Sequence, residues 1–235
     1  MVIAGLQKMT LLDYPGKVAC TVFLQGCNFR CPFCHNRDLL DVAPETISTD
    51  ELLAFLKKRQ GLLDAVCISG GEPTLQSDLE ALIRAIKALG YAVKLDTNGS
   101  RPAVLKQLVN NGLLDYVAMD VKNSPTAYGD TVGLDTINMD TIEDSLSFLL
   151  SGAVDYELRT TVVDELHSEQ SFAQLGEWLA RLSPNKKAKR FFLQRYVDRD
   201  SVLCEGLHAP SDEKLAALRD ILAPYVWEIS IRGEG

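Results

Sequence analysis

Three cysteines lie within one short stretch of the chain, "QGCNFRCPFCHN", which runs from Gln25 to Asn36. Cys27, Cys31 and Cys34 follow one another at spacings of four and three positions. Thiols this close together are typical of metal sites, but structural zinc sites and ordinary iron–sulfur clusters take four protein ligands. The stretch therefore raises the question of a fourth ligand elsewhere in the chain.

No other residue is a convincing fourth ligand. His35 is adjacent to Cys34, and neighbouring side chains rarely reach one ion together. Cys20 and Cys67 lie in apolar stretches that are predicted to be strands, where free cysteine is a common core residue. Cys204 stands alone in a loop-like stretch. A closed zinc site therefore lacks a ligand, although a structural zinc module stays an alternative.

A [4Fe-4S] cluster with three thiolate ligands explains the stretch better. Such a cluster keeps one iron open, and an open coordination position marks a catalytic metal centre rather than a structural one. A small ligand could chelate that iron. The missing fourth cysteine then becomes the functional feature.

Polar motifs follow three of the predicted strands. "SGGEP" occupies residues 69–73, "DTNG" occupies residues 96–99, and "AMDVK" places Asp120 and Lys122 at the end of a third strand. Two glycines allow a close backbone approach to a ligand. Because ligand sites in parallel sheets lie at the carboxyl ends of the strands, we expect these motifs to gather beside the cysteines.

Apolar stretches of strand length alternate with helical patterns along the chain, which predicts βαβ units and a parallel sheet. Roughly six units in one series, with no linker-like tract, indicate an α/β partial or full barrel in a single domain, residues 1–235. A helix is expected over 49–59, with Thr49 or Asp50 as its N-terminal cap. The other expected helices are 77–90, 101–112, 138–151, 168–182 and 211–223, and the expected strands are 17–25, 65–69, 91–96, 115–121, 156–163, 190–196 and 226–231.

Composition excludes several classes of protein. The formal net charge is -8, which argues against nonspecific binding to a nucleic-acid backbone. No apolar run approaches the roughly 18 residues that span a membrane, and no signal-peptide pattern opens the chain. We therefore expect a cytoplasmic protein, in which six cysteines indicate metal or redox chemistry rather than disulfides.

Taken together, these motifs resemble those of a known superfamily. Cys27, Cys31 and Cys34, with the aromatic Phe33 before the last cysteine, resemble the signature of radical S-adenosylmethionine enzymes. "GCNFRCPFCHN", "SGGEP", "DTNG" and "MDVK", in this order, resemble the activases of glycyl radical enzymes. Within them the chain is most similar to anaerobic ribonucleoside-triphosphate reductase activating proteins, and it is also similar to pyruvate formate-lyase activase. The resemblance covers about residues 1–200.

The resemblance implies a fold, two cofactors and a reaction. The fold is a partial (β/α)6 barrel of the radical S-adenosylmethionine type, and the cofactors are a [4Fe-4S] cluster and S-adenosylmethionine. Reductive cleavage of S-adenosylmethionine gives methionine and a 5′-deoxyadenosyl radical, which takes a hydrogen atom from a glycine of a partner enzyme under anaerobic conditions. The implied partners are a glycyl radical enzyme and an electron donor of the flavodoxin or ferredoxin type.

The resemblance also assigns roles to residues, and it requires no conventional acid–base pair. Cys27, Cys31 and Cys34 match the cluster ligands. Contacts with S-adenosylmethionine are expected at Phe33, Asn36, Ser69, Gly70, Gly71, Glu72, Asp96, Thr97, Arg159 and Gln194. Asp96, Thr97 and Asp120 match positions that hold a monovalent cation, Na⁺ or K⁺, in pyruvate formate-lyase activase. Lys122 matches a basic position near the cofactor or substrate and is the candidate for a catalytic role.

Two features depart from the pattern of these activases. They usually carry Asp-Gly-Pro-Gly-x-Arg before the first strand, whereas this chain has Asp13-Tyr14-Pro15-Gly16-Lys17-Val18. The missing arginine leaves the identity of the partner enzyme open. Only Cys67 lies between Cys34 and Ser69, so a second cluster is not expected there.

Other functions remain alternatives. A radical enzyme acting on a small molecule, similar to the deazaguanine synthases, would share the same motifs. An electron-transfer iron–sulfur protein is a more remote alternative, since it has no need for "SGGEP" or "DTNG", or for an open iron.

Overall fold

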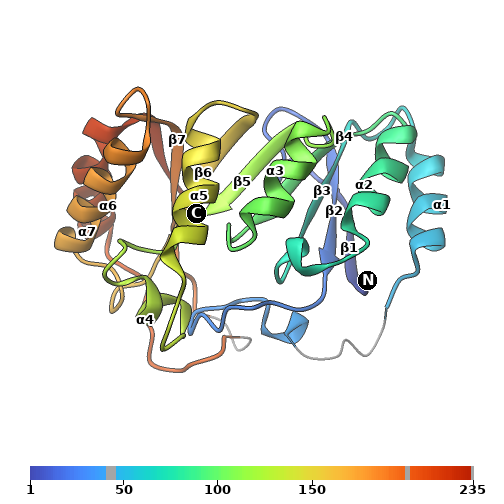
Figure 1. Cartoon of the computed structure of the whole chain (residues 1–235). Coiled ribbons are helices and arrows are strands. Elements are labelled where there is room, and N and C mark those ends of the chain that lie inside the picture. The colour runs from blue at the N-terminus through green and yellow to red at the C-terminus, as the bar shows by residue number, and fades with distance from the viewer. Residues whose placement is uncertain (41–45, 199–201, 234–235) are drawn as a thin grey trace. The chain divides into compact units, whose positions relative to one another are not determined.

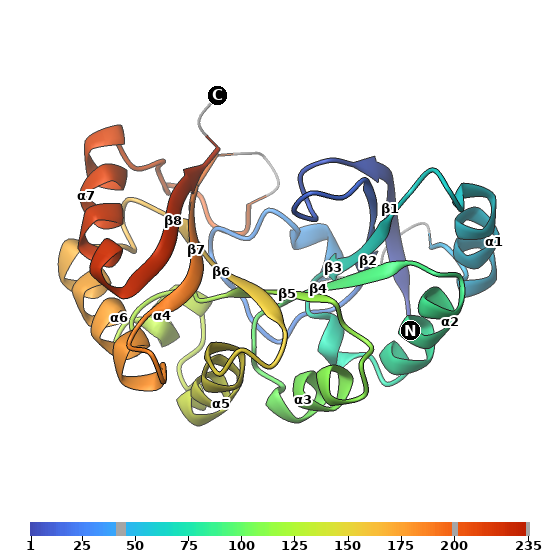
Figure 2. The same ribbon diagram turned by 90° about the horizontal axis from the view of Figure 1, so that it is seen from above.

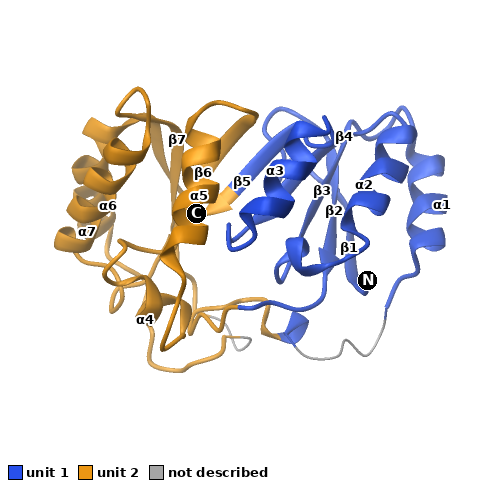
Figure 3. Cartoon of the chain, viewed as in Figure 1, with its two compact units in different colours: residues 1–28, 38–118 blue, residues 29–37, 119–235 orange. Residues whose placement is uncertain are grey.

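The computed structural model of the chain describes residues 1–40, 46–198 and 202–233. The chain forms two compact units (Figure 3). The first unit contains residues 1–28 and 38–118, and the second contains residues 29–37 and 119–235. The boundary falls inside the cysteine stretch, so Cys27 belongs to the first unit and the other two cysteines to the second. A single domain over residues 1–235 stays a prediction.

The first unit is a sheet covered by helices. Its strands β1 (Ile3–Thr10), β2 (Ala19–Leu24), β3 (Ala65–Gly70) and β4 (Ala92–Thr97) lie side by side in chain order. The helices α1 (Thr49–Arg59), α2 (Leu79–Ala88) and α3 (Pro102–Asn110) lie along one side of these strands (Figure 2). The next strand, β5 (Tyr116–Asp120), begins in the first unit and ends in the second.

The second unit repeats this plan. The strands β6 (Asp155–Val162), β7 (Ala188–Arg195) and β8 (Val226–Arg232) are parallel neighbours. A short helix α4 (Tyr128–Val132) precedes α5 (Met139–Leu150), and α6 (Glu169–Leu182) and α7 (Asp212–Leu222) follow along the chain (Figure 1). Short 3-10 turns lie at Arg37–Leu39, Pro73–Leu75 and Ala223–Tyr225. Among the described helices, none combines the length and apolar character that crossing a membrane requires.

The expected strands and long helices are all present, with ends shifted by a few residues at most. The predicted parallel pairing is present from β2 to β4 and from β6 to β8, whereas β1, which was not predicted, pairs with β2 in the antiparallel direction. β1 escaped prediction because only its first and last residues, Ile3 and Thr10, are buried, so it lacks the regular burial of the central strands. The short α4 was not predicted either, since five residues are too few to show a helical period.

The start of α1 corrects a second detail. Thr49 or Asp50 was expected to cap the helix, but Ser48 is the capping residue. The Glu51 backbone N–H donates to Ser48 Oγ at 3.2 Å, and the Ser48 backbone N–H donates to Glu51 Oε2 at 2.8 Å. This reciprocal pair satisfies two backbone donors that the first turn leaves without partners. Leu52 and Leu56 then form the buried side of the helix.

Candidate functional site

Three loops of the first unit meet around Cys27. The loop that follows β2 leads into Cys27, and the loops after β3 and β4 contain the "SGGEP" and "DTNG" motifs. Asn98 Nδ2 lies 3.9 Å from Cys27 Sγ and donates to Asn28 Oδ1 at 3.0 Å. Asn28 Nδ2 in turn donates to Ser100 Oγ at 3.0 Å. The loop after β4 therefore positions the first cysteine, a role for Asn98 that a turn signal alone did not reveal.

Two glycines allow the loop after β3 to reach the loop that carries Cys27. The Gly71 N–H donates to the Leu24 carbonyl at 2.9 Å, and the next backbone N–H, of Glu72, donates to the Gly26 carbonyl at 2.7 Å. A Cβ atom on Gly70 would lie 2.2 Å from the Leu24 carbonyl oxygen, and one on Gly71 would lie 2.1 Å from the Gly26 oxygen. Gly70 also has a φ of +126°, which side chains rarely tolerate. Close packing therefore requires both glycines.

The buried side chain of Glu72 connects these loops through hydrogen bonds. Its side chain is completely buried. Oε1 accepts hydrogen bonds from the Thr74 N–H at 3.1 Å, from the Thr74 hydroxyl and from Thr97 Oγ1 at 2.8 Å, while Oε2 accepts from the Asn98 N–H at 2.6 Å. Burial raises the pKa of Glu72, and these hydrogen bonds oppose that rise. The carboxylate thus connects the loops after β3 and β4, a role that was not predicted.

The remaining cysteines lie in a loop of the second unit that is held from one side by the end of α4. Cys31 and Phe33 are buried and Cys34 is half-buried. The Arg30 N–H donates to the Val132 carbonyl at 2.9 Å. Gly133 follows with a φ of +67°, and a Cβ atom there would lie 2.3 Å from the Arg30 carbonyl oxygen.

The segment after β7 holds the same loop from another side. The His35 ring stacks on the Tyr196 ring with centroids 5.5 Å apart, and His35 Nε2 lies 2.7 Å from the Val197 carbonyl oxygen. The Cys204 N–H donates to the Pro32 carbonyl at 3.0 Å. This backbone contact places Cys204 beside the cysteine loop, while its thiol's lack of a ligand role stays a prediction. Its sequence neighbours gave no signal of this contact, which depends on the path of the chain after β7.

An ion-paired group stands beside Cys31 and Phe33. Asp120 accepts from Lys122 Nζ at 2.9 Å and from Arg159 Nε at 2.9 Å. Although burial raises the pKa of Asp120, these two cations hold it well below the usual range of a carboxyl. Burial lowers the pKa of Lys122, but the Asp120 carboxylate outweighs that effect and raises it above its ordinary value. Lys122 Nζ also lies 5.9 Å from the centroid of the Phe33 ring. The second unit therefore brings together five of the residues that sequence motifs singled out.

The two carboxylates expected to share an alkali cation lie in different units. Asp120 has the two cationic partners described above, and Asp96 has Lys94, whose Nζ lies 2.6 Å from Asp96 Oδ1. The cation was expected because Asp96, Thr97 and Asp120 match a cation site of pyruvate formate-lyase activase, and because two carboxylates close together repel one another unless a cation lies between them. Each carboxylate has a cationic partner within its own unit, which weakens the second reason. The cation itself stays a prediction.

The other residues singled out in the sequence lie outside the two groups of contacts described above. Gln194 pairs in register with Thr161 on the neighbouring strand, and Thr161 Oγ1 donates to Gln194 Oε1 at 3.4 Å. Asn36 is exposed in the cysteine loop. Cys20 and Cys67 are fully buried in strands, and burial raises the pKa of each thiol to about 12. Both lie in the core of the first unit, as expected for free cysteines in apolar strands.

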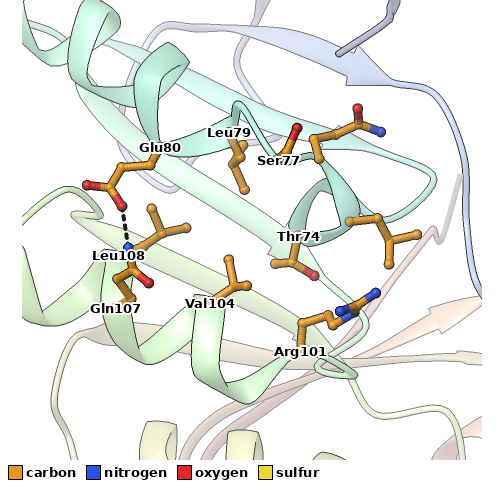
Figure 4. A pocket seen from close by; sticks show the side chains of 10 residues that line it. Thr74, Ser77, Leu79, Glu80, Arg101, Val104, Gln107 and Leu108 are labelled. Carbon is orange, nitrogen blue, oxygen red and sulfur yellow. Dashed lines mark hydrogen bonds between the residues drawn. The ribbon is translucent and has the colours of Figure 1, made fainter.

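A pocket of about 260 Å³ was not predicted from the sequence (Figure 4). It lies in the first unit, and none of the predicted site residues lines it. Gln107 and Glu80 face each other across part of it, with Gln107 Nε2 donating to Glu80 Oε2 at 2.6 Å. Its lining consists of Thr74, Leu75, Gln76, Ser77, Leu79, Glu80, Arg101, Val104, Gln107 and Leu108.

Comparison with known proteins assigns this arrangement to a family. Residues 21–150 match the family model of the radical SAM superfamily, in which SAM denotes S-adenosylmethionine. The chain belongs to the radical SAM superfamily. Over 98% of its length it is 31% identical to a protein of Methanocaldococcus jannaschii named "Putative glycyl-radical enzyme activating enzyme", of which it covers 95%. A "7-carboxy-7-deazaguanine synthase" of Koribacter versatilis is 31% identical over 62% of each chain.

A solved structure supports the fold. A crystal structure of a domain of pyruvate-formate lyase-activating enzyme from Bacteroides vulgatus superimposes with a TM-score of 0.58 at 20% identity, over 72% of this chain and 99% of that one. The expected α/β fold, a partial (β/α)6 barrel of the radical SAM type, is confirmed. The expected resemblance to glycyl-radical-enzyme activases is confirmed as well.

Membership of the superfamily implies a [4Fe-4S] cluster and S-adenosylmethionine as cofactors. The donor set fits such a cluster, because the cysteine stretch supplies three cysteines that form no disulfide, and cysteine thiolates are the usual ligands of iron–sulfur clusters. Among the residues that the structure describes, no group of three or more His, Cys, Asp or Glu side chains is close enough to hold a metal ion. The three cysteines are divided between the two units, so their joint role as ligands stays a prediction.

Proposed function

We propose that this protein is an activase that cleaves S-adenosylmethionine reductively and removes a hydrogen atom from a glycine of a glycyl radical enzyme. The observation that carries the proposal is the similarity to the M. jannaschii relative, which extends over 98% of this chain and 95% of the relative. The loop arrangement around Cys27 supports it, because three separate strand ends contribute to one position. When bound, the cluster and S-adenosylmethionine supply the carbon radical that performs the abstraction.

The loops of the first unit hold and orient the cofactors in this proposal. Cys27, Cys31 and Cys34 would ligate the cluster. Residues 69–71 would receive the cofactor's amino group, and Gly70 and Gly71 hold this loop in close packing against the loop that carries Cys27. Glu72 acts as a positioning residue, because its carboxylate oxygens already accept hydrogen bonds from the neighbouring loops. Asp96 and Thr97 lie at the end of the adjacent strand β4.

The second unit supplies aromatic and cationic groups. Phe33 provides a surface for the adenine, and Asn36 and Gln194 provide polar contacts. Lys122 and Arg159 act as fixed cations near the substrate or cofactor carboxylate. The pKa of Lys122 lies above its ordinary value, so this amine stays protonated at neutral pH and does not serve as a general base.

The proposed substrate is a protein loop that carries a glycine. Glycine offers no side chain to block approach, and flanking amide groups stabilise a radical on its Cα atom. A loop of the partner enzyme would also exclude water from the reactive carbon radical. We further propose a flavodoxin- or ferredoxin-type electron donor and a cytoplasmic location.

Cluster assembly and cofactor cleavage test the first half of this proposal. Anaerobic reconstitution of the wild type should give an oxygen-labile cluster with about four irons and four sulfides. The Cys27→Ala variant should lose iron and 5′-deoxyadenosine formation, whereas Cys204→Ala, as the matched control, should keep both. A full cluster in Cys27→Ala together with a defective one in Cys204→Ala would contradict the ligand assignment.

A small-molecule radical enzyme is the second candidate. The similarity to the Koribacter versatilis 7-carboxy-7-deazaguanine synthase, over 62% of each chain, supports it. The two candidates differ in their products. An activase leaves a lasting radical on a partner protein, whereas a small-molecule enzyme converts its substrate stoichiometrically with the cofactor it consumes.

A further inference from the structure

A buried lysine of the first unit has no role in the proposed reaction. Lys94 lies in the middle of β4, and only 1% of its side chain is exposed. Lysine is almost never buried to this degree unless it is paired. Its partner is Asp96, whose Oδ1 lies 2.6 Å from Lys94 Nζ. Because side chains alternate along a strand, the two residues point to the same face of the sheet, two positions apart.

The strand register fixes the lysine in this position. Cys67 on β3 is the Cα partner of Lys94, and Thr21 on β2 is the Cα partner of Cys67. All three lie in the buried part of the first unit. The ammonium therefore lies on the same face of the sheet as Asp96, among buried residues of β2 and β3.

The oxygens that could hold an alkali ion in this unit already have partners. Asp96 Oδ1 accepts from Lys94, and Asp96 Oδ2 accepts from Ser69 Oγ at 3.2 Å. Thr97 Oγ1 donates to Glu72 Oε1 at 2.8 Å and accepts from the Gly99 N–H at 3.1 Å. The side-chain oxygens of Asp96 and Thr97 are therefore already engaged within the first unit, and Asp96 has its positive charge from Lys94.

We propose that the Lys94 ammonium is a built-in counter-cation for Asp96 and takes the place of a dissociable alkali ion at this site. An ammonium and an alkali ion carry the same charge and both bind carboxylate oxygen. A lysine, however, is attached to the chain, so its presence does not depend on the salt in solution. This inference rests on the proposed cofactor site at the end of β4, and it predicts that the site works equally well in any alkali salt.

The test replaces the lysine and changes the salt. S-adenosylmethionine affinity is measured in the chlorides of lithium, sodium, potassium and tetramethylammonium at one ionic strength, with the cluster reconstituted. Wild-type affinity should vary less than about twofold among these salts, whereas Lys94→Met should bind about tenfold more tightly in one alkali salt than in tetramethylammonium. Lys94→Arg should restore the wild-type behaviour. Lys57→Met, at an exposed position of α1, is the matched control and should behave as the wild type.

A second measurement does not involve S-adenosylmethionine. Thermal unfolding of the protein and thallium-205 magnetic resonance with thallous ion both report cation binding directly. Only Lys94→Met should be stabilised by an alkali or thallous ion. Cation binding by the wild type, or a folded Lys94→Met that binds the cofactor with no salt dependence, would overturn the inference.

Two further outcomes also bear on the inference: a Lys94→Met variant that does not fold, and a wild type that does not bind S-adenosylmethionine. If Lys94→Met does not fold, the Lys94→Met/Asp96→Asn double variant removes both charges, and it should fold without any response to cations. An alkali response of that double variant would overturn the inference. If the wild type binds no S-adenosylmethionine at all, the proposed function fails, while the thallous-ion measurement still decides the role of Lys94.

Discussion

At the scale of single residues, the sequence predicted the local motifs of the candidate site but not the contacts between residues far apart in the chain. The three cysteines and the "SGGEP" and "DTNG" motifs are local patterns, so the sequence alone identified them. The pairing of Lys94 with Asp96 and the contact of Cys204 with Pro32 depend on strand register and chain path. A lysine inside the apolar stretch "YAVKLD" was a signal that could have prompted the search for its partner.

Glu72→Gln should destabilise the protein and weaken cofactor binding. The carboxylate accepts four hydrogen bonds in a fully buried position, and an amide would present a donor to groups that themselves donate. We expect the free energy of unfolding to fall by about 1–3 kcal/mol, as for other buried hydrogen-bonding groups left without partners. Urea unfolding of the cluster-free protein measures it. Glu51→Gln, at an exposed capping residue, is the control, and an equal loss in both variants would contradict the prediction.

His167 should make stability depend on pH. It is buried, its Nδ1 accepts from the Val163 N–H at 3.0 Å, and its Nε2 lies 2.9 Å from the Lys122 carbonyl oxygen. Burial lowers the pKa of His167, and the nearby cations Lys214 and Lys122 lower it further. The His167 imidazole therefore binds a proton less readily in the folded protein than in the unfolded chain, where a histidine has a pKa of about 6.5.

The sign of the effect follows from that difference. The contribution of His167 to the free energy of unfolding is fully present above a pH of about 6.5. It is lost as the pH falls below that value, by about 1 kcal/mol per pH unit. Urea unfolding between pH 7.5 and 5.5 should show a steeper loss in the wild type than in His167→Gln, which keeps a donor for the Lys122 carbonyl. Equal slopes in the two proteins would show that His167 does not titrate in this way.

At the scale of elements, apolar periodicity predicted the long helices and central strands because their buried faces are regular. It failed for β1, where most residues are partly or fully exposed, and for α4, which is too short. The loops that form the candidate site have no regular period, because contacts between neighbouring loops at the strand ends determine their conformations. The glycines of these loops could nevertheless be interpreted, because the loop backbones approach one another too closely to leave room for a side chain.

Gly71→Ala should disturb the loop that leads to Cys27. A Cβ atom would lie 2.1 Å from the Gly26 carbonyl oxygen, so one of the two backbones has to move. We expect a loss of about 2 kcal/mol in the free energy of unfolding, a cost typical of overpacking, together with weaker S-adenosylmethionine binding. Gly61→Ala, with a φ of +80° but open space, is the control for backbone strain alone. A cofactor affinity unchanged in Gly71→Ala would contradict the role of this close approach.

At the scale of the whole molecule, the family was predictable and the reaction partner was not. Superfamily membership depends on short motifs that any member must keep, and the comparisons confirm it. The partner depends on surfaces that recognise one protein, and the departure at residues 13–18 removes the arginine by which the usual pattern would be recognised. The division of the cysteine loop between two compact units was also invisible in the sequence, since it depends on long-range packing.

Electron paramagnetic resonance of a partner enzyme tests the central claim most directly. The reduced, cluster-loaded protein is incubated anaerobically with S-adenosylmethionine and candidate glycyl radical enzymes, with Cys27→Ala as the matched inactive control. The account predicts a glycyl doublet in one partner, formed with 5′-deoxyadenosine, absent with Cys27→Ala and absent when the partner's glycine is replaced by alanine. Sustained, stoichiometric conversion of a small molecule, with no doublet from any candidate, would contradict the activase function and favour the small-molecule enzyme.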